Sequence, residues 1–170
     1  MIFALACNLH KNNLSYLIFK EKRMEEIKMT RIKITSGKFT FIGKLEEEQC
    51  PKTCEWFLNL LPYQETMIHV SWSGQASFIR LQDLGHGVPF ECATSRPSKG
   101  EVLMYPGNIP TLQMGGEIFL PWGGNVFACP NGNLVGNHFM TIIEGNEHLD
   151  EFGRTVHLQG GQEIVFEKLD

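Results

Sequence analysis

Residues 49–62, QCPKTCEWFLNLLP, have the features of a short buried helix. Proline suits a first helical position because the N–H that it lacks would be unpaired there anyway, and Pro62 supplies a stop at the other end. A helix over residues 51–61 would carry one apolar stripe, made of Cys54, Phe57, Leu58 and Leu61. The segment therefore predicts a helix that packs on a core along this stripe.

Cys50 and Cys54 raise the question of a redox or metal site. Such pairs usually have the spacing C-x-x-C, which brings both sulfurs to one helix N-terminus or one ion, whereas this pair is C-x-x-x-C. Buried cysteine also packs as a small hydrophobe. We expect core or cap positions for both residues, with a metal site or a disulfide as the alternatives.

The composition of the chain bounds its class. Its 170 residues, 42% of them hydrophobic, can bury one sizeable core and most simply form one domain. The 17 glycines and 12 phenylalanines favour strands joined by tight turns. A formal charge of −4 without a dense Lys/Arg face argues against nucleic acid and acidic membranes as partners. Five irregularly spaced cysteines, an odd number, fit a reducing cytoplasm.

The first 28 residues differ from the rest. Their start, MIFALAC, is too short for a secretory h-region and has no positive n-region before it. Codons for residues 24–29, MEEIKM, can contain a purine-rich GGAGG just before the ATG of Met29, which looks like a ribosome-binding site. We expect residues 1–28 to be a disordered translated leader and residues 29–170 to be the folded domain. A genuine amphipathic arm is the alternative.

After Thr30, short alternating segments follow one another between turns that contain Gly or Pro. The predicted strands are residues 31–35, 39–43, 66–72, 76–81, 101–105, 117–120, 125–128, 139–143 and 162–168. A second short helix is expected over residues 147–152, capped by Asn146 and ended by Gly153. This mainly β pattern predicts a closed β-barrel with two short helices at its ends.

Two segments resemble cyclophilins. The opening hairpin is followed by LEEEQCPKTCEWFLNLL at residues 45–61, similar to the cyclophilin acidic loop, Pro-Lys-Thr and helix with an aromatic residue at the place of Phe57. Residues 131–133, NGN, and 136–142, GNHFMTI, are similar to the cyclophilin Asn-Gly-x-Gln-Phe-Phe-Ile strand. The resemblance implies a cyclophilin-like barrel.

A closer resemblance covers nearly all of residues 30–170. It is to a family of bacterial and archaeal cyclophilin-like proteins of unassigned function, and it is carried by WSG (72–74), GEVLMYPG (100–107), EIFLPWG (117–123) and GNHF (136–139). The same domain resembles the N-terminal part of cucumopine synthase, which joins histidine to a 2-oxo acid. The resemblance implies a small-molecule pocket and opine-synthase-like proton transfer on an amino-acid or 2-oxo-acid compound.

Two other functions compete with this hypothesis. A non-catalytic metabolite-binding module needs the same concave apolar pocket with a few polar groups. Prolyl isomerisation is the rival enzyme activity, because residues 78–81, FIRL, are similar to the cyclophilin Phe-His-Arg strand, whose arginine bonds the proline nitrogen. No Pro-Gly-Phe or Gln-Gly-Gly follows Leu81, so we rank isomerisation last.

His138 and Glu117 are the candidate catalytic residues. His138 follows a loop rich in Gly and Asn and precedes an apolar strand, so an imidazole that exchanges protons near neutral pH could lie at the barrel mouth. Glu117 opens an otherwise apolar strand, where burial would raise the pKa of its carboxyl group. The alternatives are a hydrogen-bonded structural histidine and a glutamate that projects into solvent.

Five further residues are candidates for substrate binding. Asn137 could orient a carboxylate or support its turn. Glu101 and Tyr105 are four apart on a predicted strand and hence on one face, as a polar wall or an ordinary edge. Trp72 and Trp122 adjoin turns that contain Gly, where each ring could floor a pocket or pack in the core.

The sequence predicts neither a metal nor a cofactor. The histidines have no metal-ligand spacing among themselves or with cysteine. Phosphate loops, nucleophile elbows and dinucleotide fingerprints are also missing from the sequence. The expected partner is a small-molecule ligand, without nucleic acid or membrane, and homo-oligomerisation is left open.

Overall fold

The computed structural model describes residues 29–107 and 115–169, so the expectations for residues 1–28 lie outside the described residues. The strands are β1 (Arg31–Ser36), β2 (Phe39–Leu45), β3 (Tyr63–His69), β4 (Gly74–Gln82), β5 (Ala93–Thr94), β6 (Glu101–Tyr105), β7 (Gly116–Asn125), β8 (Ala128–Cys129), β9 (Gly132–Asn133), β10 (Gly136–Glu144) and β11 (Gln162–Lys168). The helices are α2 (Pro51–Leu60), the 3-10 helix η1 (Asn146–His148) and α3 (Leu149–Gln159).

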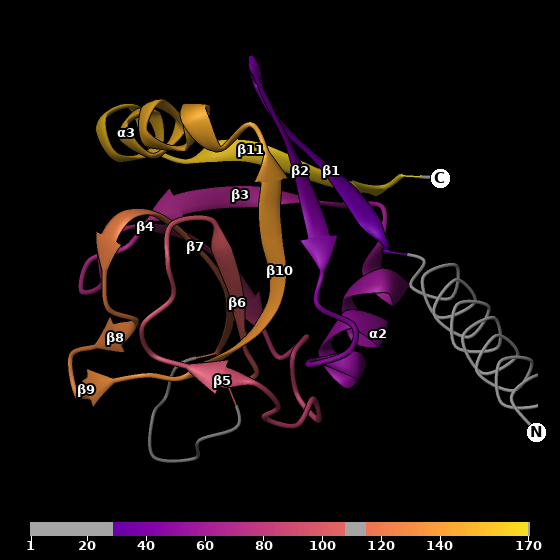
Figure 1. Ribbon diagram of the computed structural model, residues 1–170. Coiled ribbons are helices and arrows are strands. Elements are labelled where there is room, and N and C mark those ends of the chain that lie inside the picture. The colour runs from indigo at the N-terminus through magenta and orange to yellow at the C-terminus, as the bar shows by residue number, and fades with distance from the viewer. Residues whose placement is uncertain (1–28, 108–114, 170) are drawn as a thin grey trace, which may run out of the picture.

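Eight antiparallel strands close into a barrel, as the sequence predicted. Their order is β2-β1-β11-β3-β4-β7-β6-β10, and pairing of β10 with β2 completes the ring. Figure 1 shows α3 lying across β3 and α2 at a separate position near the lower part of β10. The short β5 extends the sheet beyond β10, and β8 pairs with β9 outside the barrel.

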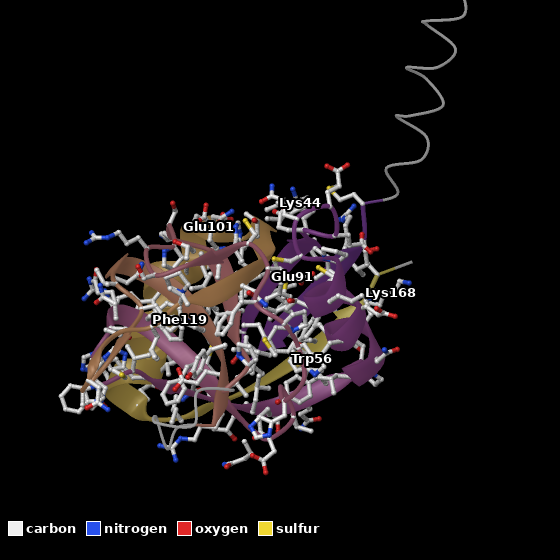
Figure 2. All side chains as sticks on the ribbon, turned by 90° about the horizontal axis from the view of Figure 1, so that it is seen from below. Lys44, Trp56, Glu91, Glu101, Phe119 and Lys168 are labelled. Carbon is white, nitrogen blue, oxygen red and sulfur yellow. The ribbon has the colours of Figure 1, made fainter. Side chains whose placement is uncertain are left out.

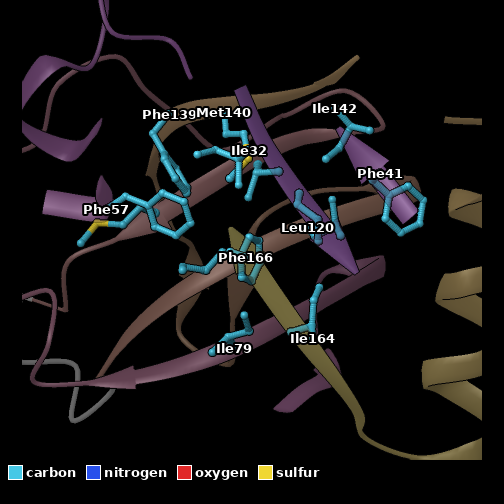
Figure 3. Close-up of a cluster of buried hydrophobic side chains, with 14 of the residues drawn as sticks. Ile32, Phe41, Phe57, Ile79, Leu120, Phe139, Met140, Ile142, Ile164 and Phe166 are labelled. Atoms are coloured by element: carbon cyan, nitrogen blue, oxygen red, sulfur yellow. The ribbon is translucent and has the colours of Figure 1, made fainter. Parts of the chain in front are cut away.

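The barrel interior is filled by aliphatic and aromatic side chains from almost every strand (Figure 3). β1 and β11 each alternate in burial, so Ile32, Ile34, Ile164 and Phe166 point inward and are at most 2% exposed. From α2, Phe57 packs edge-on against Phe166. Burial of each such side chain contributes about 1.5–3 kcal/mol, so this cluster is the main source of stability.

A second apolar cluster lies on the outer face of β4, β7 and β6. β6 alternates between the two clusters: Val102 and Met104 belong to the interior, whereas Leu103 and Tyr105 belong to the outer cluster. Phe127, from the segment between β7 and β8, packs on the outer Phe119 and Tyr105. The segment after β7 therefore covers this part of the outer barrel face.

The predicted first helix and opening hairpin are confirmed, with bounds that differ by one or two residues. The predicted strand at residues 66–72 is shifted, because β11 pairs with β3 from Tyr63 to Met67 and the chain turns before Trp72. The prediction of two separate strands at residues 117–120 and 125–128 is wrong. β7 is one strand through Pro121, which pairs with Ala76 of β4.

The predicted end of the second helix at Gly153 is also wrong. α3 continues to Gln159, and Gly153 is an interior helical position. A Cβ atom at residue 153 would collide with the ring of Trp122. The glycine is therefore required for close packing of α3 on the barrel and not for ending the helix.

Candidate functional site

Arg80, Glu117 and Tyr105 form a polar row across three neighbouring strands of the outer barrel face. Arg80 of β4 is the register partner of Glu117 of β7, and Glu117 is in turn the partner of Tyr105 of β6. Register partners in antiparallel strands project from the same face. The row therefore combines a cation, a carboxyl group and a phenol on one patch of sheet.

A cavity of about 350 Å³ lies beside Arg80 and Glu117. The turn between β3 and β4 forms one wall, which includes Trp72, and Phe78 of β4 supplies a second aromatic ring. The volume is within the range of small-molecule sites, which are about 300–1,000 Å³. A ligand in this cavity would contact the charged groups and both aromatic side chains.

Glu117 is the most perturbed carboxyl group of the described residues. Only 8% of the residue is exposed, and burial raises the pKa of the carboxyl group to about 7, against the opposing effect of the Arg80 guanidinium. The two side chains do not form an ion pair, although they are cross-strand neighbours. The sequence left a desolvated and a solvent-exposed carboxyl group open, and the structure has the desolvated one.

Tyr105 lies beneath this site and is fully buried. Its hydroxyl group has no hydrogen-bond partner among the described residues. Burial is the largest cause that raises the pKa of Tyr105, and the nearby Cys129 and Glu117 add to it. A buried phenol without a partner is uncommon in folded proteins. Its aromatic contacts with Phe90 and Phe127 hold the ring in the outer cluster.

The two candidate tryptophans lie in different places. Trp72 is 63% exposed and lines the Glu117 cavity. Trp122 is only 4% exposed and belongs to the interior cluster, where it contacts Gly153. It lines a smaller, second cavity and not the one beside Glu117. The structure therefore brings only Trp72 to the proposed pocket.

His138 does not line the Glu117 cavity either. Its Nε2 atom lies 2.9 Å from the hydroxyl oxygen of Thr141, and that hydroxyl group donates to Glu46 at 2.6 Å. Because the single hydroxyl proton of Thr141 is used for Glu46, Nε2 of His138 must be the donor to Thr141. Glu46 also pairs with Lys44. The imidazole thus ends a chain of polar contacts that continues through Thr141 to Glu46 and Lys44. Glu117, its predicted catalytic partner, lies at the separate cavity.

Asn137 is completely buried beside the start of α2, with all its amide groups in use. Its oxygen accepts from the backbone of Glu91 at 2.8 Å, and its nitrogen donates to Thr53 at 2.9 Å and to the Pro89 carbonyl at 2.8 Å. Glu91, labelled in Figure 2, accepts from the N–H groups of Lys52 and Thr53. Asn137 therefore supports the cap of α2, and no free group remains for a ligand.

Glu101 lies at the other end of β6 from Tyr105, on the same face of the strand. Its carboxylate accepts the backbone N–H of Ser98 at 2.7 Å, and it is not part of the Glu117 cavity. Figure 2 shows Glu101 near the rim of the molecule. Glu101 and Tyr105 therefore do not form one polar wall. Glu101 contacts the loop before β6, whereas Tyr105 is buried at the end of the row with Arg80 and Glu117.

Cys50 and Cys54 are both buried at the start of α2. Burial raises the pKa of Cys50 to about 11 and that of Cys54 to about 12, so neither thiol ionises readily. No cluster of three or more potential metal ligands occurs within residues 29–107 and 115–169. In the same ranges no helix is both long and apolar enough to cross a membrane.

Sequence analysis missed two important residues. Arg80 entered only through the isomerase alternative, and its pairing with Glu117 depends on strand register over 37 positions of sequence, from 80 to 117. Glu91 was not considered, although it caps α2 in place of the Cys50 side chain. The only signal for such a cap was negative, since residue 50 is not one of the usual capping residues Ser, Thr, Asp or Asn.

Comparison with solved structures shows the fold. McbB in complex with tryptophan matches with a TM-score of 0.60 and 17% identity, over 80% of this chain and 44% of McbB. The hypothetical protein AF2241 from Archaeoglobus fulgidus matches with a TM-score of 0.50 and 18% identity, over 83% and 95% of the two chains. A cyclophilin-type peptidyl-prolyl cis-trans isomerase from Cryptosporidium parvum gives 0.51 and 17%, over 84% and 99%.

The structural matches show a shared cyclophilin-like barrel, and at 17–18% identity they show no shared activity or ligand. The chain spans less than half the length of McbB. No curated protein matches its sequence. One family model matches residues 32–168, which is the whole barrel from β1 to the end of β11. The chain is therefore a member of the protein family of unknown function DUF3830, with a cyclophilin-like fold.

Proposed function

We propose that the Glu117 cavity binds a small compound of the amino-acid or 2-oxo-acid type and that Glu117 transfers a proton to or from it. The observation that carries this proposal is a buried carboxyl group with a pKa of about 7 beside a guanidinium group at a cavity. A group with its pKa near the working pH is suited both to accept and to release protons. Perturbed groups of this kind gather at functional sites.

The other groups of the cavity define the ligand. Arg80 can hold a ligand carboxylate through two parallel N–H donors, since it forms no ion pair with a carboxylate of residues 29–107 or 115–169. Trp72 and Phe78 supply flat apolar surface for a side chain or ring. McbB, whose solved structure contains tryptophan, is an independent reason to test amino acids first.

Binding would prepare Glu117 for the proton transfer. A ligand carboxylate on Arg80 would neutralise the cation that now lowers the pKa of Glu117. The same ligand would exclude water from the cavity, and both changes raise the proton affinity of the carboxylate. The ionised form of Glu117 would then take a proton from an amine or a carbon acid of the ligand, and the protonated form would return it to another atom of the ligand. Such a transfer typically contributes about 10²–10⁴-fold to a rate.

The test is a ligand screen followed by solvent deuterium exchange. Amino acids and 2-oxo acids are first screened by thermal shift, where ligand at 100 times its dissociation constant adds about 2.7 kcal/mol. Ligands that bind are then incubated in D₂O, and loss of their C–H signals is followed by NMR. We expect exchange with the wild-type protein, binding without exchange for Glu117→Gln, and weak binding for Arg80→Gln.

Glu101→Gln is the matched control, because it removes a carboxylate of the same barrel that does not line the cavity. It should bind and exchange like the wild type. Binding that depends on Arg80 but gives no exchange would make the protein a non-catalytic metabolite-binding module. Absence of any ligand, or exchange that survives Glu117→Gln, would contradict the proposed proton transfer.

A further inference from the structure

A second cavity, of about 260 Å³, lies between α3 and the strands β3, β4 and β7. The side chains that line it and carry polar groups are His69, Gln75, Trp122, Arg154 and His157. None of the described residues that line it is acidic. The cavity is thus rich in hydrogen-bond donors and holds a permanent cation, whereas the Glu117 cavity is built around a carboxyl group.

One polar atom at this cavity is buried without a partner among the described residues, the indole Nε1 of Trp122, a residue that is 4% exposed. The ring of His69 lies 6.1 Å from the Trp122 ring, centroid to centroid, and has a hydrogen bond with the Ala76 backbone. Indole nitrogen can only donate a hydrogen bond, so its partner must be an acceptor. A buried donor that lacks an acceptor is costly, by about 1–3 kcal/mol. This combination calls for a ligand that carries acceptor atoms.

The geometry of the two histidines argues against a metal ion. Their rings are stacked, with centroids 4.0 Å apart and an angle of 22° between the planes. Because the nitrogen lone pairs lie in the ring planes, two nearly parallel rings cannot aim them at one ion between the rings. Parallel N–H groups can instead reach two oxygen atoms of one ligand.

We propose that this cavity is a binding site for a small oxyanion, a carboxylate or a phosphate, held by Arg154, the two stacked imidazoles and the indole N–H of Trp122. Arg154 donates through Nε to Asp150 at 2.8 Å, which fixes its side chain along α3. Its remaining guanidinium N–H groups can point to the oxyanion, as arginine commonly does when it bridges two acceptors. The site is independent of the function proposed for Glu117.

Binding should be coupled to proton uptake by His69. The pKa of His69 is lowered by burial and further by His157, with a weaker opposing effect from the Ala76 backbone. Arg154 of α3 is the charged residue among the described lining and is paired with Asp150, while β4 and β7 contribute the neutral Gln75 and Trp122. An oxyanion would favour the protonated imidazole of His69, so affinity should rise as the pH falls.

The experiment is an NMR titration of the full chain with acetate and, separately, with inorganic phosphate, at pH 6 and pH 8. The indole N–H signal of Trp122 is assigned by comparison with Trp122→Phe and followed to saturation. We expect saturable binding of one or both anions, about tenfold tighter at pH 6 than at pH 8. The two arms tell a carboxylate site from a phosphate site. Sodium chloride at equal ionic strength is the reference.

Two variants locate the binding. Arg154→Gln should weaken it by about tenfold or more, as loss of a charge-assisted hydrogen bond does. His69→Gln should remove most of the pH dependence. His148→Gln is the control, since His148 precedes α3 and does not line the cavity. A response that does not saturate, that chloride reproduces, or that Arg154→Gln leaves unchanged would overturn the proposal.

Discussion

Two clusters of polar residues in this barrel, one at the start of α2 and one on the outer face of β7, differ in how many hydrogen bonds and ion pairs their members form. At the start of α2, Asn137 has three hydrogen bonds and Glu91 accepts from the backbone and side chain of Thr53. On the outer face of β7, Glu117 is buried without an ion pair, and the hydroxyl group of Tyr105 has no partner among the described residues. Satisfied groups of this kind hold a fold together, and unsatisfied ones are candidates for meeting a ligand.

The largest effect is expected from breaking the satisfied cluster. Asn137→Leu removes three hydrogen bonds and leaves the backbone N–H of Glu91 and the Pro89 carbonyl without their partner. We expect a loss of about 3–5 kcal/mol in the free energy of unfolding. Chemical denaturation with urea measures it. Asn133→Ala, at an exposed position of β9, is the control and should change stability by less than about 0.5 kcal/mol.

A small loss for Asn137→Leu, together with weaker ligand binding, would reverse the comparison. Asn137 would then be the substrate-binding residue that the sequence suggested, and its hydrogen bonds would be incidental to stability.

The next largest effect concerns Glu117, whose burial should make the stability of the protein depend on pH. A folded-state pKa of about 7 for Glu117, above its value of about 4.3 in the unfolded chain, means that the folded protein binds the proton more tightly. The contribution of Glu117 to stability is therefore greatest below about pH 4 and falls as the pH rises to about 7, by up to about 3 kcal/mol.

Glu117→Gln should remove this loss. The variant should resemble the wild type at pH 4 and be more stable at pH 8, and urea denaturation across this range measures the difference. Glu101→Gln, with its carboxylate on the Ser98 backbone, should follow the wild-type pH profile in this range. A Glu117→Gln curve parallel to the wild type would mean that the carboxyl group ionises as it does in water.

The fold was predictable because its signals are local. Alternation along residues 31–35 and 162–168 and the proline-led stripe of α2 could be recognised within one segment each. Gly153 was misinterpreted because a glycine that ends a helix and one that admits a tryptophan ring look alike in sequence. Only the packing of α3 on Trp122 distinguishes the two.

The candidate site was less predictable because its partners are distant in sequence. The sequence left open whether Glu117 is buried or exposed, and its neighbour Arg80 depends on the register of β4 and β7. His138 and Asn137 are adjacent in sequence and alternate on a strand, so they face different surroundings. Residue type alone could not distinguish the hydrogen-bonded amide of Asn137 from the desolvated carboxyl group of Glu117.

A smaller effect is expected at His138, which has one hydrogen bond, to Thr141, and does not line the Glu117 cavity. His138→Gln removes or lengthens one hydrogen bond to Thr141, so the free energy of unfolding should fall by about 1 kcal/mol. Because His138 does not line the Glu117 cavity, ligand affinity should be unchanged. Urea denaturation and calorimetric titration measure the two quantities. Loss of proton exchange at unchanged affinity would support the catalytic role that the sequence suggested.

The smallest effect concerns prolyl isomerisation, for which we expect no acceleration in a peptide assay. Arg80 lies on the outer face of the barrel, and Glu117 is its cross-strand neighbour. An ionised carboxylate there offsets the field that a guanidinium group would exert on a proline nitrogen.

Glu117→Gln provides the sharper test, since it leaves Arg80 in a cavity of the same size without the carboxylate. If both the wild type and this variant are inactive, the missing Pro-Gly-Phe and Gln-Gly-Gly segments account for it, because nothing after Leu81 builds a proline pocket. Activity in the variant alone would show that the carboxylate suppresses isomerisation. Wild-type activity that Arg80→Ala abolishes would contradict our prediction and assign the cavity to peptide substrates.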